Sequence, residues 1–363
     1  MQWDLNGIAE ARAIESGGTE LLSPNHMLYR PIGFVIYEVA RLSGYRGRSV
    51  EILQYVTAIL ASLGVGLFFM AANQLTGNLV AATVSTVFLV ASWSYWTFST
   101  DAYYITPAAA AVAGALAILL WRPKLSVLSS VIAGLVGALA VLFWQANVFL
   151  VPSLLVGILW TQRTSTLQSR LMLASVFLVS LGATVGVSYG LGATLAHGHF
   201  AFGELVRWAS SHSSQGQVPL WGKWSIDRIP AAASSAVAAF VPVWEGVGLR
   251  SLMKGVLDWG KVLPQLSLVA LVLLCVWSAI KLVRRRARSG DIVWLGLSYL
   301  AYVPFIVWWD PCEPKWFVVP SVFLVVLLAE IWSRDTKPKQ YIVLGMCIAV
   351  RRYNQKLWIG EGE

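Results

Sequence analysis

Residues 79–121 read LVAATVSTVFLVASWSYWTFSTDAYYITPAAAAVAGALAILLW, and Asp101 is the only charged residue among them. The stretch contains two apolar runs, 79–98 and 103–121, which meet at this aspartate. A run of about 20 mostly apolar residues is long enough to cross the hydrocarbon core of a bilayer as a helix. The stretch therefore predicts two membrane spans joined by a short aromatic turn.

The rest of the chain has the same apolar character. Of its 363 residues, 57% are hydrophobic and only 12% are charged, and the mean hydropathy is +0.66. Soluble domains carry about twice this share of charged residues. These values exclude a disordered chain and an ordinary water-soluble enzyme, and they predict an all-α, polytopic transmembrane helical bundle.

The apolar runs predict how many times the chain crosses the membrane. Candidate spans are 50–73, 79–98, 103–121, 126–143, 146–160, 171–194, 264–283, 292–309 and 316–333. A further run at 341–350 is short, so we expect about nine to ten spans. The chain then divides into five parts. Residues 1–49 form an outer-face region with interfacial helices, 50–195 the first part of the bundle, and 196–263 a long extracytoplasmic loop. Residues 264–350 form the last part of the bundle, and 351–363 form a tail.

The basic residues predict the orientation of the bundle. The formal net charge is +9, and many basic side chains flank the spans. If successive spans cross the membrane in alternating directions, one group of basic residues falls on the same side of the membrane. These residues are Arg122, Lys124, Arg163, Arg170, Lys281 to Arg288 and Arg334 to Lys339. Lys and Arg mark the cytoplasmic side of membrane proteins. We therefore expect a multi-pass protein of the cell (inner) membrane, with the lipid bilayer and not nucleic acid as the partner of these charges.

The same alternation places residue 1 outside the membrane without a preceding span. The sequence therefore predicts that a first transmembrane helix is missing, and that the last span is incomplete. The segment 28–43 carries Arg30, Glu38 and Arg41 and is short for a span. Its pattern favours a helix that lies in the membrane interface.

Two aspartates stand at the predicted outer face. Asp4 belongs to WDLNGIAEARAIESGG, which predicts a short amphipathic helix ending at Gly17 and Gly18. Asp101 lies at the outer end of a span, and a charge in that position is costly and usually functional. For both residues the alternative is an N-cap: Asp4 near the start of its own helix, and Ser99, Thr100 or Asp101 for the helix that follows.

A third cluster, WWDPCEPKWFVVP at 308–320, lies between two predicted spans. The alternation of spans places this turn, and the polar hinge at Gln145, on the outer side of the membrane. Asp310, Glu313 and Lys315 are polar residues that any turn would need. In a functional interpretation, Lys315 faces a phosphate, and the tryptophans pack on a lipid chain or a sugar ring. The long loop at 196–263 is rich in Trp and Arg, which also favours carbohydrate and phosphate contacts.

Other chemistries lack their sequence signatures. The histidines of the long loop have no metal-ligand spacing, and the three cysteines of the chain form no CxxC pair. There is no Walker motif and no Ser-His-Asp order. ATP-driven chemistry and covalent catalysis by a serine triad are therefore not expected.

Several segments together resemble the GT-C superfamily of polytopic glycosyltransferases, the group of protein O-mannosyltransferases and aminoarabinose transferases. They are SPNHMLYRPIGFVIYEVARLSG (23–44), RSVEILQYVTAILASLGVGLFF (48–69), FLVASWSYWTFSTDAYYITP (88–107), GLVGALAVLFWQANVFLVP (134–152) and WWDPCEPKWFVVP (308–320). The sequence also departs from the family. Asn25 and Met27 break the family's His-Pro-Pro form, which only His26, Leu28 and Tyr29 follow. Gln145 stands where some relatives have His, and the family's first transmembrane helix is expected to be missing.

The resemblance implies transfer of a sugar from a polyprenyl-phosphate donor to a hydroxyl or amine of a glycan, lipid or protein. It implies that Asp4 is the general base and that Asp101 has a supporting or metal-related role. No cofactor is required by this resemblance, and a divalent metal ion is the one cofactor that it allows. The expected substrate-binding residues are His26, Tyr29, Arg30, Tyr103, Tyr104, Gln145, Arg207, Lys223, Asp310, Glu313 and Lys315. The alternatives are a transporter or flippase of lipid-linked glycans and a truncated, non-catalytic remnant.

Overall fold

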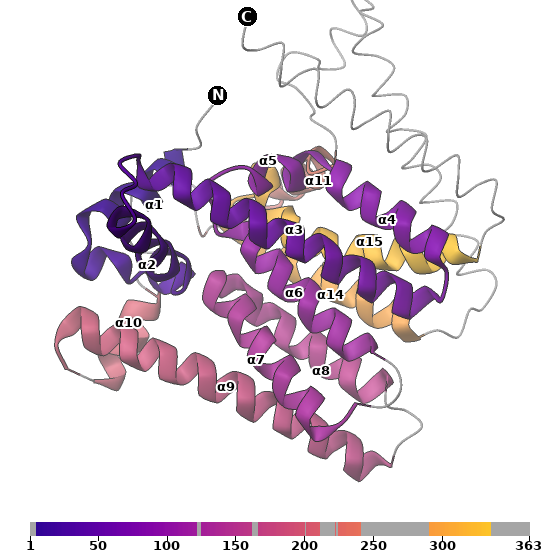
Figure 1. Cartoon of the computed structure of the whole chain (residues 1–363). Helices are drawn as coiled ribbons and strands as arrows, with labels where there is room; N and C mark the ends of the chain where they lie inside the picture. The colour runs from indigo at the N-terminus through magenta and orange to yellow at the C-terminus, as the bar shows by residue number, and fades with distance from the viewer. Residues whose placement is uncertain are drawn as a thin grey trace, which may run out of the picture.

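The computed structural model describes residues 5–121, 125–161, 166–199, 201–210, 222, 224–240 and 290–334. Every regular element in these ranges is a helix, so the expected all-α class is confirmed there (Figure 1). The predicted spans at 264–283 and 341–350 lie outside the described residues, as do Asp4 and Lys223.

The bundle is built from helices that coincide with the remaining predicted spans. They are α3 (Ser49–Thr76), α4 (Leu79–Ala91), α5 (Trp93–Ser99), α6 (Ile105–Leu120), α7 (Val127–Phe143), α8 (Leu150–Thr161), α9 (Leu167–His197), α14 (Gly290–Trp309) and α15 (Val318–Ser333). Among the described residues, three helical segments are long and apolar enough to cross a membrane: α3, α9 and Pro314–Ser333. The bent pair α4 and α5 would be a fourth, and α6, α7, α8 and α14 are shorter apolar helices. The total of nine to ten crossings remains a prediction.

Helix α6 lies at the centre of the bundle and is buried along almost its whole length. It packs against α3, α7 and α15, and Figure 1 shows it between α3 and α7. Small residues allow this approach, since a Cβ on Gly64 of α3 would lie only 2.8 Å from the Cβ of Ala110. Within lipid, close packing of this kind replaces the hydrophobic effect as the force that joins helices.

A glycine on α7 provides a test of this packing. A Cβ on Gly134 would lie 2.6 Å from the backbone oxygen of Phe177 on α9. Gly134→Ala must therefore push the two helices apart, and we expect a loss of about 1–3 kcal/mol in unfolding free energy. Gly182→Ala on α9 is the matched control, because nothing lies within 4 Å of its Cβ position. Thermal midpoints in detergent would measure both, and equal midpoints would contradict the tight contact.

The predicted span at 79–98 is not straight, because α4 and α5 meet at an angle of 67°. The break at Ser92 frees two backbone N–H groups at the start of α5. Trp93 N donates to the carbonyl of Phe240 at 3.2 Å, and Ser94 N donates to that of Ala239 at 2.9 Å. These carbonyls directly follow α11 (Arg228–Ala238). Part of the predicted outer loop therefore packs into the bundle and satisfies the broken helix, as irregular backbone inside a membrane protein requires.

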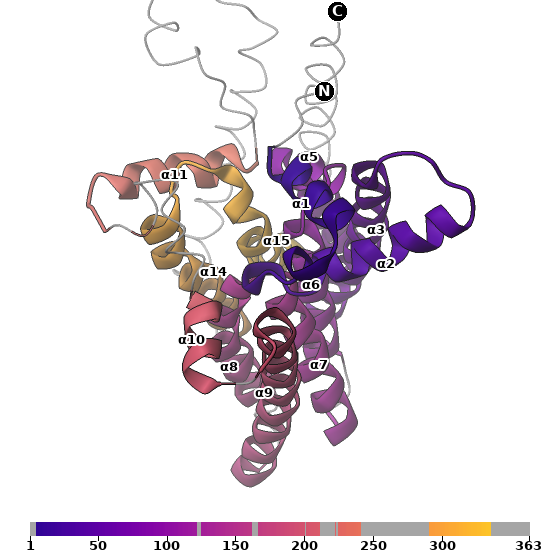
Figure 2. The same ribbon diagram turned by 90° about the vertical axis from the view of Figure 1, so that its left-hand side faces the viewer.

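The residues before α3 form a separate group of short helices at one end of the bundle (Figure 2). These are α1 (Leu5–Ser16), η1 (Gly18–Leu21), η2 (Pro24–His26) and α2 (Tyr29–Leu42). Helix α1 ends where the sequence predicts, at Gly17 and Gly18, whose φ angles of 66° and 68° favour glycine. Ser49 Oγ donates to the carbonyl of Ala11 at 3.0 Å, which fastens α1 to the start of α3.

Helix α2 confirms the short helix expected at 28–43. Its side chains Val35, Val39 and Leu42 are exposed, with Leu42 at 87%. Figure 2 shows the helix projecting sideways from the bundle. Its location in the membrane interface remains a prediction.

Candidate active site

Segments predicted to lie on the outer face meet at one end of the bundle. The η2 turn contacts the end of α7, η3 (Gln145–Phe149) and α10 (Phe202–Ser210). The η5 turn (Pro314–Phe317) contacts α5 and α11. Most of the described candidate residues therefore belong to one region, even though they come from distant parts of the sequence.

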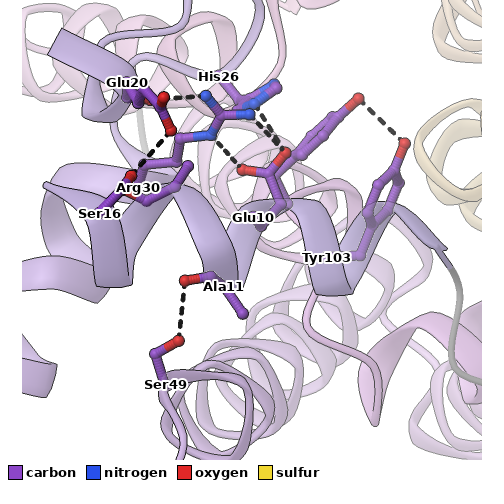
Figure 3. Close-up of polar contacts among 10 residues, drawn as sticks. Glu10, Ala11, Ser16, Glu20, His26, Arg30, Ser49 and Tyr103 are labelled. Atoms are coloured by element: carbon purple, nitrogen blue, oxygen red, sulfur yellow. Dashed lines mark hydrogen bonds and ion pairs between the residues drawn. The ribbon is translucent and has the colours of Figure 1, made fainter.

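A buried ion-pair cluster lies at the centre of this region. Glu10 Oε1 lies 3.0 Å from His26 Nε2, and Glu10 Oε2 accepts a hydrogen bond from Arg30 Nε at 2.7 Å. Arg30 Nη2 also donates to Glu10 Oε1 at 3.2 Å, so its contact is bidentate. Arg30 Nη1 donates to the carbonyl of Glu20 at 2.7 Å. Figure 3 shows the side chains of His26 and Arg30 turned toward Glu10.

Aromatic residues extend this cluster toward the rest of the bundle. The rings of His26 and Tyr104 are stacked, with centroids 4.3 Å apart and planes 12° from parallel. Tyr103 OH donates to Tyr104 OH at 3.1 Å. Tyr29 OH forms a 3.0 Å hydrogen bond with Thr57 Oγ1 on α3. His26, Tyr29, Tyr103 and Tyr104 are all buried. Their rings therefore form one tightly packed cluster, the aromatic wall.

Lys315 approaches the same wall from the turn before α15. Its side chain is only 9% exposed, and Nζ lies 5.5 Å from the Tyr103 ring centroid and 5.2 Å from that of Trp316. Glu313 Oε2 lies 3.7 Å from Nζ, but the Glu313 side chain is 48% exposed. The structure therefore brings Lys315 to Tyr103, as a common site requires.

The tryptophans of this turn pack within the protein. Trp316 stacks on Trp144, with centroids 5.7 Å apart, and Trp309 stacks on Phe305. Trp309 and Trp316 are buried. Trp316 therefore fastens the η5 turn to the end of α7, while Trp309 packs against its own helix. This is a different role from the expected contact with a lipid chain or sugar ring.

Asp101 lies between α5 and α6 and is half-buried. Its Oδ1 accepts a hydrogen bond from Ala102 N at 2.8 Å. The N-cap of α6 is Tyr104, with no side-chain cap, so the alternative role of Asp101, Ser99 or Thr100 as the cap of this helix is wrong. A Cβ on Gly7 would lie 3.1 Å from Asp101 Oδ1. The carboxylate therefore faces the backbone of α1.

The remaining candidates lie at the edge of the region. Gln145 Nε2 donates to the carbonyl of Ala209 at 3.0 Å, which connects η3 to α10. Arg207 is exposed on α10. Asp310 Oδ1 accepts from Cys312 N at 3.3 Å, as a residue that shapes a turn would. Their roles in binding remain predictions.

Glu10 and Arg228 were not among the expected site residues. The spacing of Gly7, Glu10 and Ile14 places all three on one helical face, and the flanking glycine and isoleucine are the signal that this face is buried. Arg228 donates to the carbonyls of Trp308 at 2.8 Å and Trp309 at 3.3 Å. Arg228 thus stabilises the C-terminal end of α14. A local sequence pattern does not predict a contact between residues 80 positions apart.

The charge of Glu10 depends on its two partners. Burial alone would raise the pKa of its carboxyl group. The charges and hydrogen bonds of His26 and Arg30 outweigh that effect and lower the pKa from 4.5 to about 2. Glu10 is therefore ionised, and its lone pairs are already engaged.

This pKa predicts how stability depends on pH. A carboxylate whose pKa is lower in the folded state stabilises the fold above pH 4.5, and this contribution, about 3 kcal/mol, is lost as the pH falls toward 2. We expect Glu10→Gln to lack this part of the acid dependence. Thermal midpoints at pH 6, 4 and 3 would measure it, with Glu20→Gln, an exposed carboxylate, as the control. Identical pH profiles for the parent and Glu10→Gln would contradict the lowered pKa.

In the part of the chain that the structure describes, no group of three or more His, Cys, Asp and Glu residues could hold a metal ion. Chemically, the described region offers cationic groups for an anion, aromatic faces, and one half-buried carboxylate.

Comparisons with known proteins identify the fold. No family model and no curated protein sequence matches the chain. The structure is similar to ArnT from Cupriavidus metallidurans bound to undecaprenyl phosphate, with a TM-score of 0.59 and 18% identity over 94% of this chain and 57% of that chain. The apo state of the same protein gives a TM-score of 0.58 and 17% identity, over 93% and 56% of the two chains.

A third solved structure, the Archaeoglobus fulgidus oligosaccharyltransferase in complex with Zn and sulfate, has a TM-score of 0.48 and 14% identity, over 90% and 42% of the two chains. The chain spans just over half the length of the ArnT chain. The expected resemblance to GT-C membrane glycosyltransferases is confirmed at the level of the fold.

Proposed function

We propose that this protein is a glycosyltransferase of the cell membrane. It would move a sugar from a polyprenyl-phosphate donor to an acceptor hydroxyl or amine on the extracytoplasmic face. The observation that carries the proposal is the gathering of His26, Arg30, Tyr103, Tyr104 and Lys315 at one end of an ArnT-like bundle. One of the ArnT structures was solved with undecaprenyl phosphate bound, which supports the same class of donor here.

The proposed reaction is a single displacement. The acceptor oxygen or nitrogen attacks the anomeric carbon, the bond from that carbon to the phosphate oxygen breaks, and the polyprenyl phosphate leaves with the electron pair. A carboxylate takes the acceptor proton, and such general-base help raises rates by about 10²–10⁴-fold. We assign this role to Asp4 and a supporting role to Asp101. No covalent intermediate with the protein is needed.

The leaving phosphate needs positive charge close to it. His26, Arg30 and Lys315 are the proposed phosphate contacts. His26 and Lys315 lie against the aromatic wall, and Arg30 shares the Glu10 carboxylate with His26. The other proposed contacts, for the sugar or the acceptor, are Tyr29, Gln145, Arg207, Lys223, Asp310 and Glu313. The acceptor itself is a glycan, a lipid or a protein.

A transfer assay tests this function directly. Membranes that contain the protein would receive radiolabelled polyprenyl-phosphate hexoses, with and without a chelator of divalent metals, beside membranes that lack the protein. We expect label to leave the lipid and enter a new product only when the protein is present. Label that stays on the lipid with every donor would contradict the proposal. Movement of intact donor across the membrane would instead favour a transporter of lipid-linked glycans.

A further inference from the structure

Glu10 is a buried carboxylate that the proposed reaction does not use. Its side chain is only 5% exposed, and burying a charge is costly unless it is paired and hydrogen-bonded. Both oxygens contact basic side chains, His26 from η2 and Arg30 from α2. A buried charge of this kind either stabilises the fold or serves the residues that it holds.

The contacts of Glu10 restrict how its partners can point. The bidentate contact with Arg30 fixes the plane of the guanidinium group. Because Oε1 also lies 3.0 Å from His26 Nε2, the imidazole is held on the other side of the same carboxylate. Glu10 thus orders two basic side chains that come from different elements.

His26 connects this group of charges to the aromatic wall. His26 stacks on Tyr104, Tyr104 is hydrogen-bonded to Tyr103, and Lys315 lies over the Tyr103 ring. An unbroken series of contacts therefore joins Glu10 to Lys315 across the candidate site (Figure 3 shows its first part).

We propose that Glu10 is a positioning residue, which orients His26 and Arg30 so that they can bind the phosphate of a polyprenyl-phosphate donor. This inference rests on the proposed function, because it assigns a role within that site. Glu10 itself does not touch the reacting atoms. It acts before the chemical step, so its loss should weaken donor binding more than it slows turnover.

The test compares Glu10→Gln and Glu10→Asp with the parent in the full-length chain. The Kd for undecaprenyl phosphate would be measured in detergent, and the KM and kcat for a radiolabelled polyprenyl-phosphate hexose in membranes. We expect Glu10→Gln to raise Kd and KM about tenfold and to change kcat less than threefold. Glu10→Asp keeps the charge and should stay within about threefold of the parent Kd. An unchanged Kd in Glu10→Gln, or a loss confined to kcat, would overturn the proposal.

Glu20→Gln is the matched control. Glu20 contacts Arg30 through its backbone carbonyl, while its carboxylate accepts from Ser16. We therefore expect the parent Kd for this variant, and a tenfold loss would overturn the proposal, because any nearby negative charge would then have the same effect.

Two further results separate the possible failures. If Glu10→Gln does not fold, Arg30→Gln replaces it, with a tenfold weaker Kd expected and an unchanged Kd overturning the proposal. If the parent binds undecaprenyl phosphate but transfers no sugar, the proposed function fails, while a weaker Kd in Glu10→Gln still supports the positioning role. If the parent transfers sugar and Glu10→Gln keeps the parent KM, the positioning role fails and the function stands.

Discussion

Asp4→Asn is expected to lower kcat for sugar transfer by about a hundredfold or more, and to change the KM for the donor by less than about threefold. The substitution removes the charge that accepts the proton but nearly keeps the size of the side chain. Insertion and folding should therefore be preserved. The role of Asp4 comes from the resemblance to GT-C enzymes, since the residue lies outside the described part of the structure.

Asp101→Asn is the informative comparison for this prediction. Its carboxylate is half-buried, accepts from Ala102 N and faces the α1 backbone near Gly7. A supporting role predicts a smaller loss of kcat than for Asp4→Asn. Single-turnover rates with saturating donor would rank the two variants. A full rate in Asp4→Asn together with a large loss in Asp101→Asn would reverse the assignment and make Asp101 the base.

The positions of the helices could be predicted from the sequence because a bilayer leaves the chain few choices. Every backbone polar group in hydrocarbon must be bonded within the protein, so apolar runs of sufficient length become helices. The run at 79–98 shows the limit of this argument. It is mostly apolar, yet it bends by 67° at Ser92, where Ala239 and Phe240 accept hydrogen bonds from the freed N–H groups. A hydropathy pattern cannot predict a hydrogen-bond partner that lies about 145 residues away in the sequence.

The candidate site could be predicted in part for a related reason. Polar and aromatic residues between apolar runs must lie at one end of the bundle or the other, which is why His26, Tyr104 and Lys315 were expected on the same, outer face. Glu10 was missed because a carboxylate on a short amphipathic helix is usually solvated. Only its spacing with Gly7 and Ile14 indicates that it lies on the buried face, and only the structure shows its two basic partners.

The second large effect is expected at Lys315. Lys315→Met keeps an unbranched side chain that can pack between Tyr103 and Trp316, but it removes the ammonium group that lies near both rings. A hydrogen bond to a charged group contributes about 1.5–3 kcal/mol, so we expect Kd for undecaprenyl phosphate to rise by about 10- to 100-fold. Equilibrium binding in detergent would measure this without requiring turnover.

The control for Lys315 is Arg334→Gln, which removes one positive charge at the opposite end of α15, where Arg334 pairs with Glu330. Its Kd should equal that of the parent, since screening leaves little interaction between exposed charges so far apart. If Lys315→Met also keeps the parent Kd, Lys315 does not contact the phosphate, and its burial against Tyr103 is structural. If both variants weaken binding equally, the donor responds to the net charge of the protein, and the assignment of a local phosphate site at the η5 turn is wrong.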